Sequence, residues 1–166
     1  MSSANVHSPT AKFFHSGFIV VFIYALTKQL DELEELEDAA LLQTEMVFAS
    51  IFLVILVIRF LYMQFTQPSV LETPRKERLL ARIVHLAMYF TLALIAVTGL
   101  GIGALYGADI KSGQTMDALL LLHEIGVISS YWLIVGHIAA ALYHRRQADG
   151  IWDAMVPFWK ESGSGR

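Results

Sequence analysis

The sequence contains no cysteine and few charged residues, and both shortages narrow what the protein can be. Without cysteine, disulfides, iron–sulfur clusters, thiolate zinc sites and c-type haem attachment are excluded. Only 16% of the 166 residues are charged and 55% are hydrophobic, whereas about a quarter of a soluble domain is charged. This composition predicts an integral membrane protein with no nucleic-acid partner. The first residues also lack the basic segment and cleavage site of a signal peptide, so we expect a mature N-terminus.

Four apolar stretches predict an all-α, integral membrane four-helix bundle with an up-down-up-down arrangement. A membrane-spanning helix needs about 20 apolar residues. The first apolar run, residues 13–26, reaches that length only with its flanks. The length of the chain suits a single bundle and no second domain. The expected spans cover residues 11–30, 46–64, 79–105 and 118–144.

The charges between the spans predict an orientation. The loop at 65–78 is basic, while six acidic residues fall within 31–38 of the loop at 31–45. Because lysine and arginine favour the cytoplasmic side, we expect both termini and the basic loop inside, with the acidic loop outside. Leucines recur every third residue along 30–36, which predicts an acidic amphipathic helix at the membrane surface. Its charged face either is only solvated or docks a basic partner.

Three histidines lie on one stripe of the last apolar stretch. His123, His137 and His144 are spaced by fourteen and then seven residues, and on a helix these spacings return to within roughly 40° of the same face. His123 and His137 would lie about 21 Å apart along the axis. That separation places one imidazole near each face of a hydrocarbon core about 30 Å thick. Ionisable side chains at such depths usually have a function.

These histidines suit a haem better than a zinc ion or a proton relay. A structural zinc site needs four converging ligands, whereas His15, His85, His123 and His137 are distributed over three helices and two depths. A proton relay would require more carboxylates inside the spans than the sequence contains. A b-type haem needs two axial ligands from facing helices, and small residues that admit its ring. Small residues near the candidates are Ser16, Gly17, Gly126, Gly136 and 139–141.

Three further residues have open interpretations at this point. Arg59, near the end of the second span, either reaches the headgroups or meets an acidic group such as a haem propionate. His85 is interpreted as a residue that contacts a ligand or a propionate, and not as a ligand itself. His144 is followed by two arginines, and we interpret it as an interfacial cation that acts with them.

Three segments carry a resemblance to a known family. Residues 122–155 contain a histidine, a second histidine fourteen residues later, then Ala-Ala-Leu-Tyr-His, basic residues and Asp-Gly. Residues 8–18, SPTAKFFHSGF, and 82–99, RIVHLAMYFTLALIAVTG, add to this pattern. The chain resembles, over essentially its whole length, the bacterial cytochrome b561 family of four-helix membrane cytochromes, which includes superoxide oxidase. The resemblance implies a multi-pass protein of the bacterial inner (cytoplasmic) membrane.

The resemblance implies two haem sites, of which this chain keeps one complete. His15 and His137 match the axial ligands of the inner haem, and His123 matches one ligand of the outer haem. The other outer ligand, a histidine of the second helix, is absent, because Glu45 stands at the position fourteen residues before Arg59. Three interpretations of Glu45 stay open: it is a weak iron ligand, it bonds to His123, or it is a surface acid. We therefore expect one haem b, with two haems as the alternative.

The expected function is transfer of single electrons between a quinone pool, which the resemblance implies, and a redox partner, as a subunit of a respiratory complex. Bis-histidine ligation leaves no open iron position and favours electron transfer. A superoxide:quinone oxidoreductase is the first alternative, ranked lower because the acidic loop repels an anion and favours a basic periplasmic protein or partner subunit. The second alternative is a haem-depleted anchor or accessory subunit. Whether the protein is an enzyme stays open.

Overall fold

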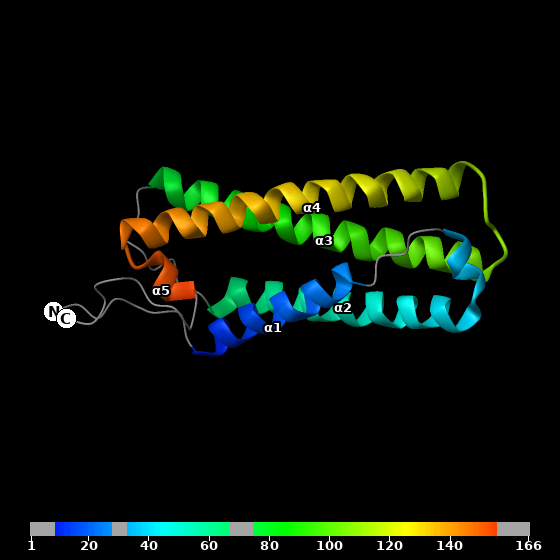
Figure 1. Ribbon diagram of the computed structural model, residues 1–166, viewed down its shortest axis with the longest axis horizontal. Helices are drawn as coiled ribbons and strands as arrows, with labels where there is room; N and C mark the ends of the chain where they lie inside the picture. The colour runs from blue at the N-terminus through cyan, green and yellow to red at the C-terminus, as the bar shows by residue number, and fades with distance from the viewer. Residues whose placement is uncertain (1–8, 28–32, 67–74, 156–166) are drawn as a thin grey trace.

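The computed structural model describes residues 9–27, 33–66 and 75–155, and within them the chain forms helices and no strand. Four long helices lie lengthwise beside one another, and the 3-10 helix η1 and the short helix α5 stand at opposite ends of the bundle (Figure 1). The prediction of an all-α protein is confirmed. The elements are α1 (Pro9–Leu26), η1 (Leu33–Glu37), α2 (Ala39–Thr66), α3 (Arg75–Gly107), α4 (Gln114–Gln147) and α5 (Ile151–Met155).

Three of the helices are long and apolar enough to cross a membrane, over Ala39–Phe65, Arg78–Gly107 and Gln114–Gln147. The apolar part of α1 within the described residues, His15–Ala25, is shorter. Large apolar side chains point outward along all the helices, as with Phe90 at 67% exposure. Such an apolar exterior suits lipid, which solvates hydrocarbon as well as a protein core does. The fourth span and the orientation across the membrane remain predictions.

The acidic segment differs from the amphipathic surface helix expected of it. Its first residues, up to 32, lie outside the described residues, and the described part forms a short 3-10 helix in which Leu36 is buried with Ile102 of α3 and Met116 of α4. Asp38 then starts α2 seven residues before the expected position, because its Oδ1 accepts the backbone N–H of Ala40 at 2.8 Å. The acidic segment therefore closes one end of the bundle through Leu36 while its described carboxylates stay exposed.

An ion pair adds to this attachment. Lys111 Nζ lies 2.8 Å from Glu37 Oε1. The hydrogen bond and the charge of Lys111 hold the pKa of Glu37 below its ordinary value, and the same hydrogen bond raises the pKa of Lys111. The contribution to stability is lost as the pH falls through the lowered pKa of Glu37 or rises through the raised pKa of Lys111. Because both side chains are exposed, solvent and salt screen the pair.

Leu36 is expected to contribute more to stability than the ion pair does. Truncation by Leu36→Ala removes a buried side chain from between α3 and α4, which typically costs about 2–3 kcal/mol. Lys111→Gln serves as the control on the same contact, and its effect should be small and vanish in high salt. Thermal or denaturant unfolding of the two variants compares them directly. A larger loss for Lys111→Gln would show that charge, and not burial, attaches the segment.

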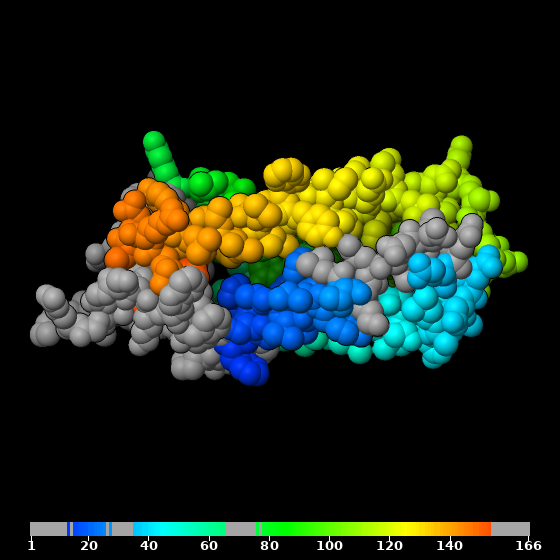
Figure 2. Space-filling model, viewed as in Figure 1, coloured from blue at the N-terminus to red at the C-terminus, as the bar shows by residue number. Residues whose placement is uncertain are grey.

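The middle of the bundle is packed around α3, which contacts both α2 and α4. Phe52 and Leu56 of α2 are buried against Leu92 and Ala96 of α3. The face seen in Figure 2 has a hollow between α1 and α4, with α3 at its floor. Because α1 packs mainly against α2, the side chains that α1 and α4 direct toward one another lie where the packing is loosest.

Candidate functional site

Five side chains from all four long helices meet in one part of the bundle, which we call the His137 cluster. The imidazoles of His15 and His137 have ring centroids 6.4 Å apart at an interplanar angle of 82°. The ring of His85 lies 5.1 Å from that of His137. Two predicted ligands from opposite ends of the sequence are therefore neighbours. The members are His15 of α1, Arg59 of α2, His85 and Tyr89 of α3, and His137 of α4.

The spacing of His15 and His137 fits two imidazoles on a single metal ion. A metal–nitrogen bond is about 2.0 Å and the nitrogen lies about 1.1 Å from the ring centre, so two axial imidazoles place their centroids about 6.2 Å apart. The observed 6.4 Å agrees with that value. In the described part of the chain, no three or more His, Cys, Asp or Glu side chains converge as a metal site. The cluster thus suits a cofactor that takes two axial ligands.

Arg59 is a cation that lies inside the cluster. Its Nε donates to the hydroxyl of Tyr89 at 3.0 Å, and its second terminal nitrogen (NH2) donates to His15 Nδ1 at 2.9 Å. Its guanidinium also lies 5.2 Å from the ring centre of Phe18. The other terminal nitrogen (NH1) is buried without a hydrogen bond, and Arg59 forms no ion pair among the described residues. Arg59 is half-buried, and a guanidinium with a buried terminal nitrogen and only neutral partners is costly, so this group suits an added anion.

The glycines near the candidate ligands fall into two kinds. A Cβ added to Gly17 or Gly136 would meet nothing within 4 Å, and both glycines are exposed, so each leaves open space on the outer surface of its helix. At Gly126 an added Cβ would lie 3.0 Å from Cγ1 of Ile95. Gly126 therefore permits close packing of α4 on α3, whereas the sequence had suggested that it admits a haem ring.

His123 lies apart from this cluster and is held against α3. Its Nδ1 is 3.0 Å from the hydroxyl of Thr98, and that hydroxyl donates to the carbonyl of Leu94 at 2.7 Å. The imidazole must then donate from Nδ1 to Thr98. A Cβ at Gly99 would lie 3.4 Å from Cε1 of His123, so the ring fits into the surface of α3. Glu45 stands on α2.

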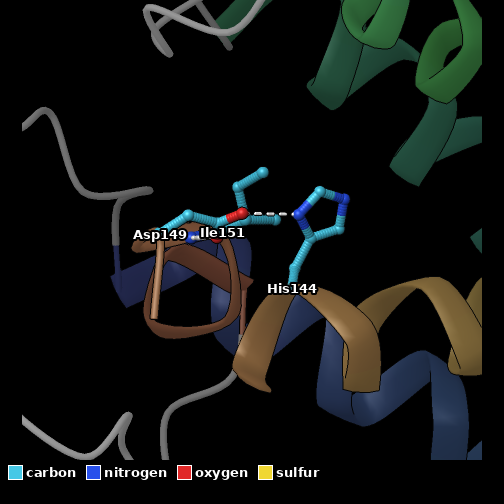
Figure 3. A network of polar contacts seen from close by, with 3 residues as sticks. All are labelled: His144, Asp149 and Ile151. Atoms are coloured by element: carbon cyan, nitrogen blue, oxygen red, sulfur yellow. Dashed lines mark hydrogen bonds and ion pairs between the residues drawn. The ribbon is translucent and has the colours of Figure 1, made fainter. Parts of the chain in front are cut away.

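His144 has a carboxylate partner that the sequence reading missed. Its Nδ1 lies 2.6 Å from Oδ2 of Asp149, and the backbone N–H of Ile151 donates to Oδ1 of the same carboxylate at 3.1 Å (Figure 3). The chain turns back after α4 through the left-handed residues Ala148, at φ 52°, and Gly150, at φ 85°. The Asp-Gly pair was a turn signal, and the turn brings Asp149 to His144. The arginines are not its hydrogen-bonding partners in this contact.

Sequence comparison gives a match over almost the whole chain. A family model described as prokaryotic cytochrome b561 matches residues 6–158. No curated protein and no solved structure matched the chain. The matched range includes every member of the His137 cluster as well as His123, His144 and Asp149.

Proposed function

Because the chain belongs to the prokaryotic cytochrome b561 family, we propose that it binds one haem b between α1 and α4 and carries single electrons. Family membership suggests a membrane haem b electron-transfer protein. The 6.4 Å spacing of the His15 and His137 rings is the observation that carries the proposal. The hollow between α1 and α4 supports it, because a ring between two helices needs room there (Figure 2).

Each member of the His137 cluster has a role in this proposal. His15 and His137 would hold the haem from its two sides. Nδ1 of His15 accepts from Arg59 in this structure, so His15 would give up that hydrogen bond and carry its proton on Nδ1 to offer Nε2 to the iron. Arg59 would receive a propionate at its buried, unbonded terminal nitrogen. Tyr89 orients Arg59 through the hydrogen bond to Nε. His85, next to His137, contacts a ligand or a propionate.

The chemistry of this site is outer-sphere electron transfer. A bound haem supplies an iron centre that gains and loses one electron at a time. The imidazoles of His15 and His137 would occupy both sides of the metal and would keep oxygen and other small molecules from it. Arg59 keeps a positive charge beside the redox centre and thereby favours the reduced form. A quinone in the bilayer is the proposed electron partner on one side, and a protein redox partner or a parent respiratory complex on the other, in the bacterial inner membrane.

One haem, and not two, is supported by Glu45, which stands where the resemblance places a histidine. His123 donates from Nδ1 to Thr98 and keeps a lone pair on Nε2, so the second site lacks its helix-two ligand and not His123. Superoxide oxidation remains the lower-ranked alternative, because the exposed carboxylates Glu35, Glu37 and Asp38 repel an anion at that end of the bundle. A haem-free accessory subunit is disfavoured by the unbonded cationic nitrogen of Arg59.

The test is a spectrum of the purified protein with its haem content. We expect one haem per chain, a low-spin spectrum with a sharp α band on reduction, and no spectral change when carbon monoxide is added to the reduced protein. Low-spin character and indifference to carbon monoxide follow from two protein ligands on the iron. Purified protein without haem, or a reduced form that binds carbon monoxide, would contradict the proposed site.

A further inference from the structure

A carboxylate–imidazole pair stands at the end of α4, outside the His137 cluster. Oδ2 of Asp149 lies 2.6 Å from Nδ1 of His144, and Oδ1 is fixed by the backbone N–H of Ile151 at 3.1 Å. The His144 and Asp149 side chains are 27% and 34% exposed. The pair is therefore held in one geometry and remains accessible.

Asp149 determines which nitrogen of His144 is available. An ionised carboxylate only accepts hydrogen bonds, so a neutral His144 carries its proton on Nδ1 and a lone pair on Nε2. Figure 3 shows the second ring nitrogen on the side of the ring away from Asp149. The carboxylate also stabilises the imidazolium that forms when Nε2 takes up a proton. The pair thus has the arrangement of an oriented base.

The pair lies on the same face of α4 as His137. Seven residues separate His137 from His144, which corresponds to about 10.5 Å along the axis and a rotation of about 20°. Exposed apolar side chains precede it on α4, with Leu142 at 41% and Tyr143 at 60%. The His144–Asp149 pair and the proposed haem site at His137 thus lie about two helical turns apart on one face of α4. Exposed apolar side chains lie beside the pair, where lipid-soluble molecules can approach it.

We propose that Nε2 of His144 exchanges protons with a quinone headgroup and that Asp149 is its positioning residue. This inference rests on the proposed function, in which a quinone is the electron partner. Oxidation of a quinol to a quinone releases two electrons and two protons. Nε2 takes a hydroxyl proton, the electron pair of the O–H bond stays on the quinol oxygen, and one electron would then leave toward the haem. The redox partner of the proposed function would take up that electron before the second one follows. His144 passes the proton to water before it accepts the second one, and the reverse steps serve quinone reduction.

The experiment measures the rate at which a short-chain benzoquinol reduces the haem of the full-length, haem-loaded protein. Dithionite, which needs no proton acceptor, is the parallel reductant. His144→Gln should slow reduction by the quinol about 100-fold and leave the haem content and the dithionite reaction unchanged. Added imidazole should restore part of the rate in His144→Ala. Asp109→Asn, which alters an exposed carboxylate between α3 and α4 at the other end of the bundle, should stay within about twofold of wild type, as expected of a surface change away from the dyad.

Asp149→Asn separates positioning from a purely structural role. Asparagine can still accept the N–H of Ile151, but its amide group donates to Nδ1 of His144 and so places the imidazole proton on Nε2. The quinol reaction should slow by at least about tenfold, and Asp149→Glu should recover most of it. If the asparagine and glutamine variants lose thermal stability yet keep the wild-type quinol rate, the pair is only a clasp between α4 and α5 and the inference is wrong.

The outcomes for wild type keep the two proposals distinguishable. If quinol reduces the wild-type protein and both variants at the same rate, this inference is wrong and the proposed function stands. If dithionite reduces the wild-type protein but quinol does not, the quinone part of the proposed function and this inference are both wrong. A protein without haem overturns the proposed haem site itself.

Discussion

Replacing His137 with alanine is expected to abolish haem binding. The imidazole of His137 is one of two whose centroids stand 6.4 Å apart, and the other belongs to His15. Even loss of a residue that only orients a ligand typically costs 10–100-fold in metal affinity, so loss of a ligand should weaken binding by more than about 100-fold. The ratio of haem to protein after purification should fall from near one to below about a tenth. His15→Ala should behave in the same way.

His123→Ala is the matched control for this prediction. It removes an imidazole from the same helix and the same stripe, but one that is bonded to Thr98 and fitted against α3. The variant should keep its haem and its α band. If His123→Ala loses haem and His137→Ala keeps it, our proposal has placed the cofactor at the wrong end of α4.

His85 provides a sharper control, because its ring lies only 5.1 Å from that of His137. If it only contacts a ligand, His85→Ala should retain one low-spin haem with a small shift of the α band. If His85 is itself the axial partner, the same variant should lose haem or bind carbon monoxide in the reduced state. The spectrum therefore assigns the second axial position independently of the ring spacing.

The sequence predicted the parts of this structure that depend on local pattern. Apolar runs of helical length gave three long helices, because burial in lipid requires only length and composition. The pairing of His15 with His137 was also expected, from the resemblance and from their comparable depth. The distance of 6.4 Å between their ring centroids places the two side chains next to each other.

The contacts that the sequence did not predict join residues whose meeting depends on how helices rotate and where turns bend. Arg59 was placed in the second span, but its bonds to His15 and Tyr89 join three helices. Leu36 sits in an acidic run whose pattern resembled a surface helix, yet the segment folds back onto the bundle end. Asp149 meets His144 only because the chain reverses at Ala148. Spacing along one helix contains no information about such geometry.

The charge of Arg59 is expected to set the reduction potential of the haem. A unit charge several ångströms from the redox centre changes its electron affinity by about 1–2 kcal/mol at an effective dielectric constant near 20. For a one-electron centre this corresponds to roughly 50–100 mV. Because a positive charge favours the state with the extra electron, Arg59→Gln should lower the potential by about this amount. Redox titration followed at the α band measures it.

Two variants distinguish charge from hydrogen bonding at this position. Tyr89→Phe removes the partner of Arg59 Nε at 3.0 Å but keeps the cation, so the potential should move by less than about a third of the Arg59→Gln shift. Arg59→Lys keeps the charge and loses the planar fork, and it should hold a near-normal potential while binding haem less tightly. An unchanged potential in Arg59→Gln, with haem fully retained, would mean that the guanidinium neither faces the cofactor nor binds its propionate. In that case, the buried terminal nitrogen without a hydrogen bond would need a different anion.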